Sequence, residues 1–260
     1  MNDFSDTLAL MPNWGRVVLL GILGAVFGSF IAALVIRWPA GRSVMRGRSA
    51  CDACGRVLRA HELVPLVSAL ASGGKCRTCA APIDPAHWRI EAVAVLIGVS
   101  AAMALPGGEA LAAAVLGWLL LALAAIDARE FWLPDELTLV LALGGVASGL
   151  LGVAPGMSER LIGGAAGFGA LWAIGAGYRL LRGRDGLGGG DPKLLGAIGL
   201  WTGWALLPVI VFVAALAGLG VALFWTLTGR GVRGDDRLPL GTLMAIAAYP
   251  ALVIMLAMTP

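Results

Sequence analysis

The sequence has 260 residues, of which 59% are hydrophobic and only 13% are charged, and its mean hydropathy is +0.87. A soluble domain usually carries about 25% charged residues, so this composition excludes a soluble globular protein. Apolar stretches of roughly 20 residues, the length that crosses a bilayer, recur along the chain. We therefore predict an all-α, polytopic membrane protein that sits in a lipid bilayer. The net charge of +3 gives no reason to expect a nucleic-acid partner.

Eight apolar segments are expected to form transmembrane helices. The second and third are separated only by Pro106-Gly107-Gly108, which predicts a helical hairpin, and the second and sixth are the shortest. Residues 1–13 contain two acids and no basic residue, so we expect no cleavable signal there. The eight segments span about residues 14–36, 90–105, 109–126, 137–153, 161–181, 194–206, 208–227 and 239–258.

The basic residues predict an orientation in the membrane. All but two of the 19 lysines and arginines, Arg16 and Arg160, lie in four polar segments, residues 37–89, 127–136, 178–193 and 228–238. With eight spans these four segments fall on one side, which the positive-inside rule identifies as the cytoplasm. The N-terminus is then expected on the opposite side.

Small residues within the apolar segments predict close helix packing, because they let backbones approach in lipid. The chain has 38 glycines. We expect packing faces at Gly163-Gly164-Ala-Ala-Gly167 and at Gly175-Ala-Gly177.

The four cysteines form two Cys-x-x-Cys pairs, Cys51 with Cys54 and Cys76 with Cys79, separated by 21 residues. Two such pairs are typical of a tetrahedral zinc site with four thiolate ligands. Four protein ligands leave no open position for a catalytic water, so the zinc is expected to be structural. The alternative is two disulfides, which the predicted cytoplasmic location disfavours.

A glycine run that ends in an acid, Gly186-Leu-Gly-Gly-Gly-Asp191-Pro192-Lys193, separates two of the apolar segments. Glycine lets other backbone or a peptide approach closely. An aspartate near the hydrocarbon boundary is costly to ionise, which makes Asp191 a candidate functional residue. The alternative is structural, because Asp191 followed by Pro192 is typical of a helix N-cap. The run alone leaves both interpretations open.

A second acid, Asp127, ends the apolar segment 109–126 and is expected at the same membrane face as Asp191. Its structural alternative is an interfacial loop acid, although Asp135, which follows Pro134, is the expected cap of the next helix. Two acids at one depth on different helices predict a dyad that shares a proton, because like charges a few ångström apart cannot both ionise. One carboxylate would take a proton from water, and the other would donate to a peptide carbonyl.

Other catalytic chemistries find little support in the residues. The histidines, His61 and His87, both lie in residues 37–89, and the chain has no His-Glu-x-x-His or Gly-x-Ser-x-Gly motif. Ser29 lies in an apolar helix without a nearby base and is expected to pack in the core. Two other functions remain open: a transporter in which the two acids relay protons, and a non-catalytic scaffold built on the cysteine-bearing segment.

The ordered motifs resemble those of the type IV prepilin peptidases, bacterial membrane aspartyl proteases with a Gly-x-Gly-Asp motif. The resemblance covers nearly the whole chain, although Ala32 and Leu63 stand where the family has asparagine. It rests on six features in sequence order: Gly28-Ser-Phe-Ile-Ala-Ala-Leu-Val-Ile-Arg37-Trp-Pro39, the paired cysteines, Arg89-Ile-Glu91, Asp127 with Leu133-Pro134-Asp135, Gly188-Gly189-Gly190-Asp191, and Pro239-Leu-Gly241.

The resemblance implies that Asp127 and Asp191 are catalytic. It implies that the substrates are precursors of type IV pilins or of type II secretion pseudopilins, cut after a short basic leader at the cytoplasmic face of the bacterial inner membrane. It also implies methylation of the new N-terminus by S-adenosylmethionine, a role associated with the cytoplasmic region, and the residues that bind this methyl donor are not predicted. Three acids, Asp185, Asp235 and Asp236, attract the leader in one interpretation and are solvated loop charges in the other.

These inferences divide the chain into three parts. Residues 1–36 are expected to hold the N-terminal segment and the first transmembrane helix. Residues 37–89 are expected to form a small cytoplasmic zinc-binding domain, and residues 90–260 a membrane-embedded aspartyl peptidase core.

Overall fold

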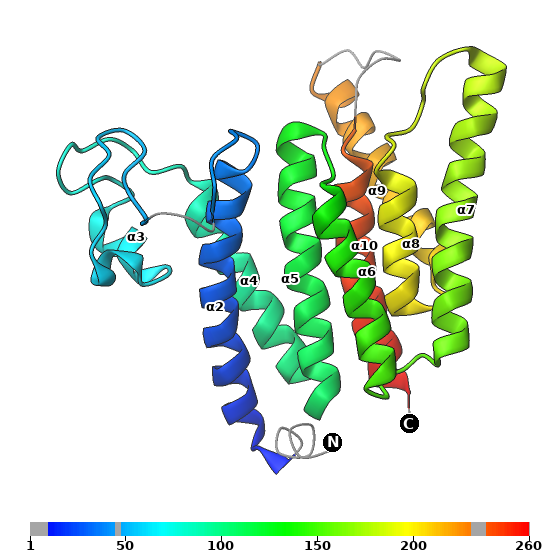
Figure 1. The fold of residues 1–260 in the computed structure, drawn as a ribbon, viewed down its shortest axis with the longest axis horizontal. Helices are drawn as coiled ribbons and strands as arrows, with labels where there is room; N and C mark the ends of the chain where they lie inside the picture. The colour runs from blue at the N-terminus through cyan, green and yellow to red at the C-terminus, as the bar shows by residue number, and fades with distance from the viewer. Residues whose placement is uncertain (1–9, 45–47, 230–237, 260) are drawn as a thin grey trace. The chain divides into compact units, whose positions relative to one another are not determined.

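The computed structural model describes residues 10–44, 48–229 and 238–259, and regular structure in these ranges is helical (Figure 1). The only β-type pairings in the same ranges are two isolated bridges, Ala50 with Val57 and Lys75 with Pro82. The predicted all-α fold is confirmed. In chain order the helices are α2 (Asn13–Arg37), η1 (Ala60–Leu63), α3 (Val67–Ser72), α4 (Ala86–Ala104), α5 (Gly107–Glu130), α6 (Asp135–Leu150), α7 (Met157–Arg182), α8 (Asp191–Thr202), α9 (Leu207–Leu227) and α10 (Leu240–Met258).

Each of the eight predicted apolar segments forms a helix, but the helices differ in length. Six of them, α2, α4, α5, α7, α9 and α10, are long and apolar enough to cross a membrane. Helix α6 has 16 residues and α8 has 12, which correspond to about 24 Å and about 18 Å. Both are shorter than a hydrocarbon core of about 30 Å. The structure therefore describes a multi-pass membrane protein with six candidate spans.

The chain divides into two compact units, Met1–Ala122 and Leu123–Pro260. In the first unit the segment 48–84, which connects α2 to α4, contains η1, α3 and the four cysteines (Figure 1). Cys76 is the only buried residue of this segment. Its fold therefore has almost no apolar core of its own.

Helices α2 and α4 of the first unit cross closely through small residues. A Cβ atom on Gly24 would overlap the carbonyl oxygen of Ala94, and one on Gly98 would overlap that of Leu20. These positions admit only glycine at this separation, as expected for helices that pack in lipid. Trp118 of α5 adds a hydrogen bond from its Nε1 to the Ala94 carbonyl, at 2.9 Å.

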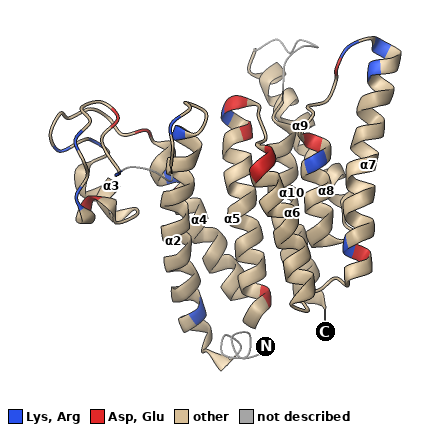
Figure 2. Ribbon diagram, viewed as in Figure 1, with Lys and Arg blue, Asp and Glu red and all other residues tan. Residues whose placement is uncertain are grey.

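In the second unit, successive helices run in alternate directions. The end of α5 and the start of α6 therefore lie at the same end of the bundle as the connection from α7 to α8 (Figure 1). The charged residues of this unit stand at helix ends and in connections, and the middle of the helices is uncharged (Figure 2). This placement suits a bundle whose middle lies in hydrocarbon.

Glycines bring α7 and α8 into close contact. A Cβ atom on Gly163 would lie 2.5 Å from the carbonyl oxygen of Gly199, and one on Gly167 would lie 2.7 Å from that of Leu195. The predicted packing face at 163–167 is confirmed. The prediction for Gly177 is wrong, because nothing lies within 4 Å of a Cβ atom placed there.

Arg160, one of the two basic residues outside the four polar segments, is completely buried near the start of α7. Its guanidinium group has no carboxylate partner among the described residues and is surrounded by carbonyl oxygens instead. Four of these carbonyls lie at the end of α8 or in the connection between α6 and α7, where carbonyls lack helical partners and carry partial negative charge, whereas Gly145 and Ser148 belong to α6 itself. Arg160 donates to the carbonyls of Gly145, Val153, Ala154, Pro155 and Leu200 and to the Ser148 hydroxyl, at 2.8–3.0 Å.

Candidate active site and metal site

Asp127 lies in the last turn of α5 and is buried. Its Oδ2 atom accepts two hydrogen bonds from Thr242, one from the backbone N–H at 2.7 Å and one from the hydroxyl at 3.0 Å. Thr242 belongs to the first turn of α10, where backbone N–H groups have no helical partner. Gly241 permits the approach, because a Cβ atom there would lie 3.0 Å from Asp127 Oδ2.

Asp191 is the first residue of α8 and is also buried. Its Oδ2 atom accepts a hydrogen bond from the backbone N–H of Gly188 at 3.1 Å, so the side chain turns back toward the glycine run. The N-cap position is held by Gly190, and no side-chain cap is formed. The N-cap interpretation of Asp191 is therefore wrong, and the carboxyl group is held by the glycine run.

Leu133 links the surroundings of the two acids. A Cβ atom on Gly190, next to Asp191, would lie 2.8 Å from Leu133 Cβ, and one on Gly241, which faces Asp127, would lie 3.0 Å from Leu133 Cδ1. The structure thus brings together two acids that are 64 positions apart in the sequence.

Asp135 does not cap α6 as predicted. The N-cap residue is Pro134, without a side-chain cap, and Asp135 is the first helical residue. Its carboxylate pairs with Lys193 of α8, whose Nζ lies 2.7 Å and 2.8 Å from the two oxygens. This exposed pair connects the beginnings of α6 and α8, the helices that follow the two acidic motifs.

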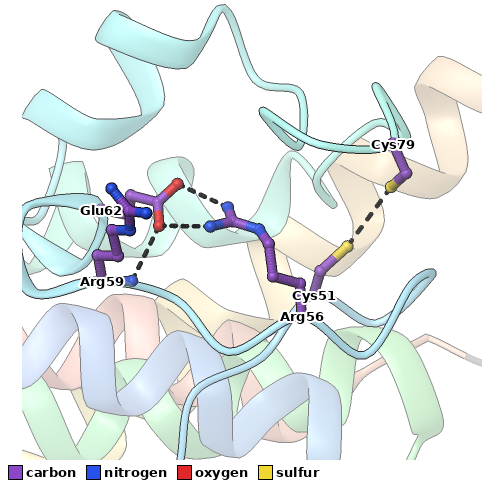
Figure 3. Close-up of polar contacts among 5 residues, drawn as sticks. All are labelled: Cys51, Arg56, Arg59, Glu62 and Cys79. Carbon is purple, nitrogen blue, oxygen red and sulfur yellow. Dashed lines mark hydrogen bonds and ion pairs between the residues drawn. The ribbon is translucent and has the colours of Figure 1, made fainter.

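The four cysteine sulfurs converge in the first unit, and all lie within 4.8 Å of one another. The cysteines are free thiols, and the sulfurs of Cys51 and Cys79 are 3.9 Å apart (Figure 3). Ligands around zinc at bond lengths of about 2.3 Å would be roughly 3.8 Å apart, so the cluster fits a tetrahedral thiolate site. The four sulfurs therefore form one cluster of free thiols and not two disulfides.

The two Cys-x-x-Cys turns have the same backbone geometry. The N–H of Gly55 donates to the Cys51 carbonyl, and the N–H of Ala80 donates to the Cys76 carbonyl, both at 2.9 Å. Gly55 and Ala80 both have positive φ, at 68° and 56°. Backbone N–H groups of Cys79 and Thr78 lower the pKa of the Cys76 thiol to about 6, which favours the thiolate form that binds a metal.

An ion pair supports the cysteine-bearing segment beside this cluster. The guanidinium of Arg56 donates to both carboxylate oxygens of Glu62, at 2.6 Å and 3.1 Å, and the backbone N–H of Arg59 donates to Glu62 at 2.8 Å (Figure 3). These donors, Arg56 first, lower the pKa of Glu62 to about 2. The carboxylate is therefore ionised at neutral pH and ties η1 to the first cysteine turn.

Comparisons with known proteins agree with this architecture. The bacterial peptidase A24 N-terminal domain matches residues 22–105, and the type IV leader peptidase family matches residues 114–223. A protein of Burkholderia pseudomallei named "Prepilin leader peptidase/N-methyltransferase" is 38% identical over 263 residues, covering 91% of this chain and 85% of the relative. This chain belongs to the type IV leader peptidase family.

Two further relatives carry the same name. The Aeromonas hydrophila protein is 39% identical over 81% of this chain and 73% of its own length. The Dickeya chrysanthemi protein is 34% identical over 96% of this chain and 97% of its own length. No solved structure matches this chain.

Some of the residues around the two acids were not predicted. Thr242 and Leu133 were assigned no role, although both lie in or beside the motifs Pro239-Leu-Gly241 and Leu133-Pro134-Asp135 that carried the resemblance. Asp185, one proposed attractant for a basic leader, is paired with Arg179. Asp235 and Asp236 lie outside the described residues.

Proposed function

We propose that this protein is a membrane aspartyl endopeptidase that removes the leader from type IV prepilins or type II secretion pseudopilins. Asp127 and Asp191 are its catalytic residues. The names of its relatives support the substrate class. The observation that carries the chemistry is that two carboxyl groups, from α5 and α8, are both buried and have neighbouring glycines, Gly241 and Gly190, that contact the same residue, Leu133.

The dyad cleaves a peptide bond by moving protons between water and the substrate. The two carboxyl groups hold one proton, because two neighbouring carboxylates in a poorly solvated site cannot both remain charged. The ionised carboxylate takes a proton from a water molecule, whose oxygen attacks the peptide carbonyl, while the protonated carboxyl group donates to the carbonyl oxygen. Collapse of the tetrahedral intermediate gives the leader a new C-terminal carboxyl group and leaves a free amine on the pilin.

The neighbours of the acids position them for these roles. The hydrogen bonds from Thr242 fix one oxygen of Asp127, and the Gly188 N–H fixes one oxygen of Asp191. Each carboxyl group has a second oxygen for water or substrate. A pilin precursor is an apolar helix behind a basic leader, so it can lie beside these helices with its cleavage site at the membrane face.

The protein is an eight-pass protein of the bacterial inner membrane, with α6 and α8 as its two short passes. Alternating helix directions in the second unit and the four basic segments support this topology, which places the active site and residues 37–89 on the cytoplasmic side. Residues 1–36 form the N-terminal segment with the first transmembrane helix. Residues 37–89 form the zinc domain, and residues 90–260 form the peptidase core.

The four cysteines hold a structural zinc ion, supported by the fit of their sulfurs to a tetrahedral site. The protein also methylates the new N-terminus of the pilin, and the word N-methyltransferase in its relatives' names supports this activity. The methyl donor S-adenosylmethionine supplies an electrophilic methyl group on a sulfonium cation. This chain's part in that reaction is to bind the donor and to admit the pilin amine.

The test is cleavage by purified protein in detergent, where no proton gradient exists. We expect a prepilin to lose its leader, and mass spectrometry of the product to report both the cleavage site and any added methyl group. Intact precursor after prolonged incubation would contradict the proposal. A transporter would require a gradient, and a scaffold would leave the precursor uncut.

A further inference from the structure

Residues 63–74, which include the short helix α3, are the longest uncharged run in the segment 48–84. Largely apolar runs of about 10–14 residues are too short to cross a bilayer, and they are typical of a buried core helix or of a segment at the membrane interface. None of residues 63–74 is buried. This run is therefore not a core element, and its length and composition favour the membrane interface.

Helix α3 turns its larger apolar side chains outward. Val67 and Leu70 are 59% and 84% exposed, and Ala71 on the same face is also exposed. Ser68 and Ala69, on the other face, are half-buried and line a cavity of about 420 Å³ inside the first unit. A surface helix in water shows the opposite arrangement, with its apolar side chains inward, whereas helices in lipid keep polar groups toward the protein. The orientation of α3 is therefore that of a helix in contact with lipid.

Contacts within the first unit place α3 beside α2 and α4, and not beyond their ends (Figure 1). The backbone N–H of Leu66, the residue before α3, donates to Glu91 at 2.8 Å, and Glu91 is the sixth residue of α4, about 8 Å along the helix axis from its start. Ser29 lines the same cavity as Ser68 and lies eight residues before Arg37, the end of α2, or about 12 Å along that helix. Ser29 is therefore at a cavity wall and is not enclosed in the core as predicted.

The depth of α3 and the charges around it both suit a lipid leaflet. Helices α2 and α4 are long and apolar enough to cross a membrane, so a position about 8–12 Å in from their polar ends falls near the boundary of headgroups and acyl chains, where interfacial helices lie. Exposed basic residues stand on both sides of the run, Arg59 before it and Lys75 and Arg77 after it. Such residues are attracted to anionic headgroups. Glu62, the acid next to the run, is paired with Arg56.

We propose that residues 63–74 insert into the lipid leaflet in which α2 ends and α4 begins, which is the cytoplasmic leaflet in the proposed topology. Val67 and Leu70 contact the acyl chains, and Lys75 and Arg77 contact the phospholipid headgroups. The segment 48–84 is then a membrane-bound element and not a domain free in the cytoplasm. It lies against the face at which a membrane-embedded substrate leaves the bilayer. The inference goes beyond the proposed function and does not depend on the peptidase chemistry.

The test is photo-crosslinking of the full-length protein in nanodiscs of phosphatidylethanolamine and phosphatidylglycerol. Leu70→Bpa and Val67→Bpa place photoreactive p-benzoylphenylalanine (Bpa) on the outer face of α3, where both side chains are exposed and the change should not disturb the fold. Ile22→Bpa, exposed on the membrane-spanning helix α2, is the lipid control, and Arg42→Bpa, exposed beyond the polar end of α2, is the aqueous control. Mass spectrometry after irradiation counts the lipid adducts. We expect both α3 variants to give about fivefold or more the adduct yield of Arg42→Bpa and to approach that of Ile22→Bpa.

Lipid adducts of Leu70→Bpa and Val67→Bpa no more frequent than those of Arg42→Bpa, with Ile22→Bpa labelled, would overturn the proposal. The same variants irradiated in cell membranes test for a protein partner. A crosslink from α3 to a second copy of the chain or to another protein, in place of lipid, would assign this face to a protein interface and would also overturn the proposal. Adding Asp127→Asn to Leu70→Bpa should abolish cleavage and leave the lipid adducts unchanged, which separates this inference from the proposed peptidase activity.

Discussion

Residues 48–84 and the helical bundle of the second unit hold their functional groups in different ways. The first segment buries only Cys76 and converges on four sulfurs, whereas the bundle buries two acids and an arginine among closely packed helices. With so little apolar core, this segment would depend for its fold on the zinc ion that we propose its four cysteines hold. The bundle depends on close backbone contact and on complete hydrogen bonding. The two regions should therefore fail under different perturbations.

The largest effect is expected from removal of a cysteine. Structural zinc sites contribute about 10 kcal/mol or more of apparent binding free energy, so Cys51→Ser should lose the metal and unfold residues 48–84. Metal analysis and trypsin digestion mapped by mass spectrometry should show this loss, while circular dichroism retains the helices of the bundle. Thr78→Ala is the control, because Thr78 supports Cys76 through its backbone N–H. If the Cys51→Ser protein lacks metal and still resists trypsin as well as the wild type does, residues 48–84 do not depend on the metal for their fold.

Within the bundle, the largest effect is expected at Arg160. Replacement by Met leaves several buried carbonyls without a donor, and we expect a loss of about 3 kcal/mol or more in the free energy of unfolding. Arg160→Lys keeps the charge but has fewer donors, so its loss should be smaller. The free energy of unfolding, measured in detergent, should be highest for the wild type, lower for Arg160→Lys and lowest for Arg160→Met. Equal stability of Met and wild type would show that the carbonyl cage is unimportant.

A smaller effect is expected at the crossing of α7 and α8. Gly163→Ala places a methyl group against the backbone of Gly199 and should destabilise the bundle by about 1–3 kcal/mol. Gly177→Ala, on the same helix with nothing within 4 Å, is the matched control and should be neutral or slightly stabilising. The same thermal unfolding assay applies to both. If both variants lose the same stability, the loss is caused by helix propensity and not by packing.

The smallest effect is expected for the pair between Lys193 and Asp135. Their side chains are 46% and 68% exposed, and exposed ion pairs contribute about 1 kcal/mol or less. Lys193→Met should therefore change the free energy of unfolding by no more than that amount. A loss comparable to that of Arg160→Met would show that a surface pair, and not the buried carbonyl cage, holds α6 to α8.

The helices and the cysteine cluster could be predicted because their signals are local. Apolar runs broken by proline, glycine and charge predicted helices at the eight observed places, and Cys-x-x-Cys spacing predicted the convergence of the sulfurs. The lengths of α6 and α8 are close to those predicted, but both helices begin and end two to four residues earlier than predicted, because the ends of an apolar run do not fix where a helix begins. Asp135 was misassigned for a related reason, since its cap position is held by Pro134 and its carboxylate pairs with a lysine 58 residues away.

The surroundings of the two acids depend on contacts between distant residues. The support of Asp127 by Thr242 joins positions 115 apart in the chain, and the Glu91 contact with Leu66 crosses from α4 to a loop. No periodicity or motif spacing reports such pairs. Small residues gave only a partial signal: Gly163 packs against α8 and Gly177 faces open space, although both stand in similar sequence.

The most direct test of the account is prepilin cleavage by Asp127→Asn and Asp191→Asn, with Asp185→Asn as the matched control. Asparagine preserves shape and removes the proton-exchanging group, so each of the first two variants should lose about 10²- to 10⁴-fold in cleavage rate with unchanged thermal unfolding. The exposed Asp185 should tolerate the change. Cleavage at the wild-type rate in either Asp127→Asn or Asp191→Asn would contradict the proposal that these two acids act together.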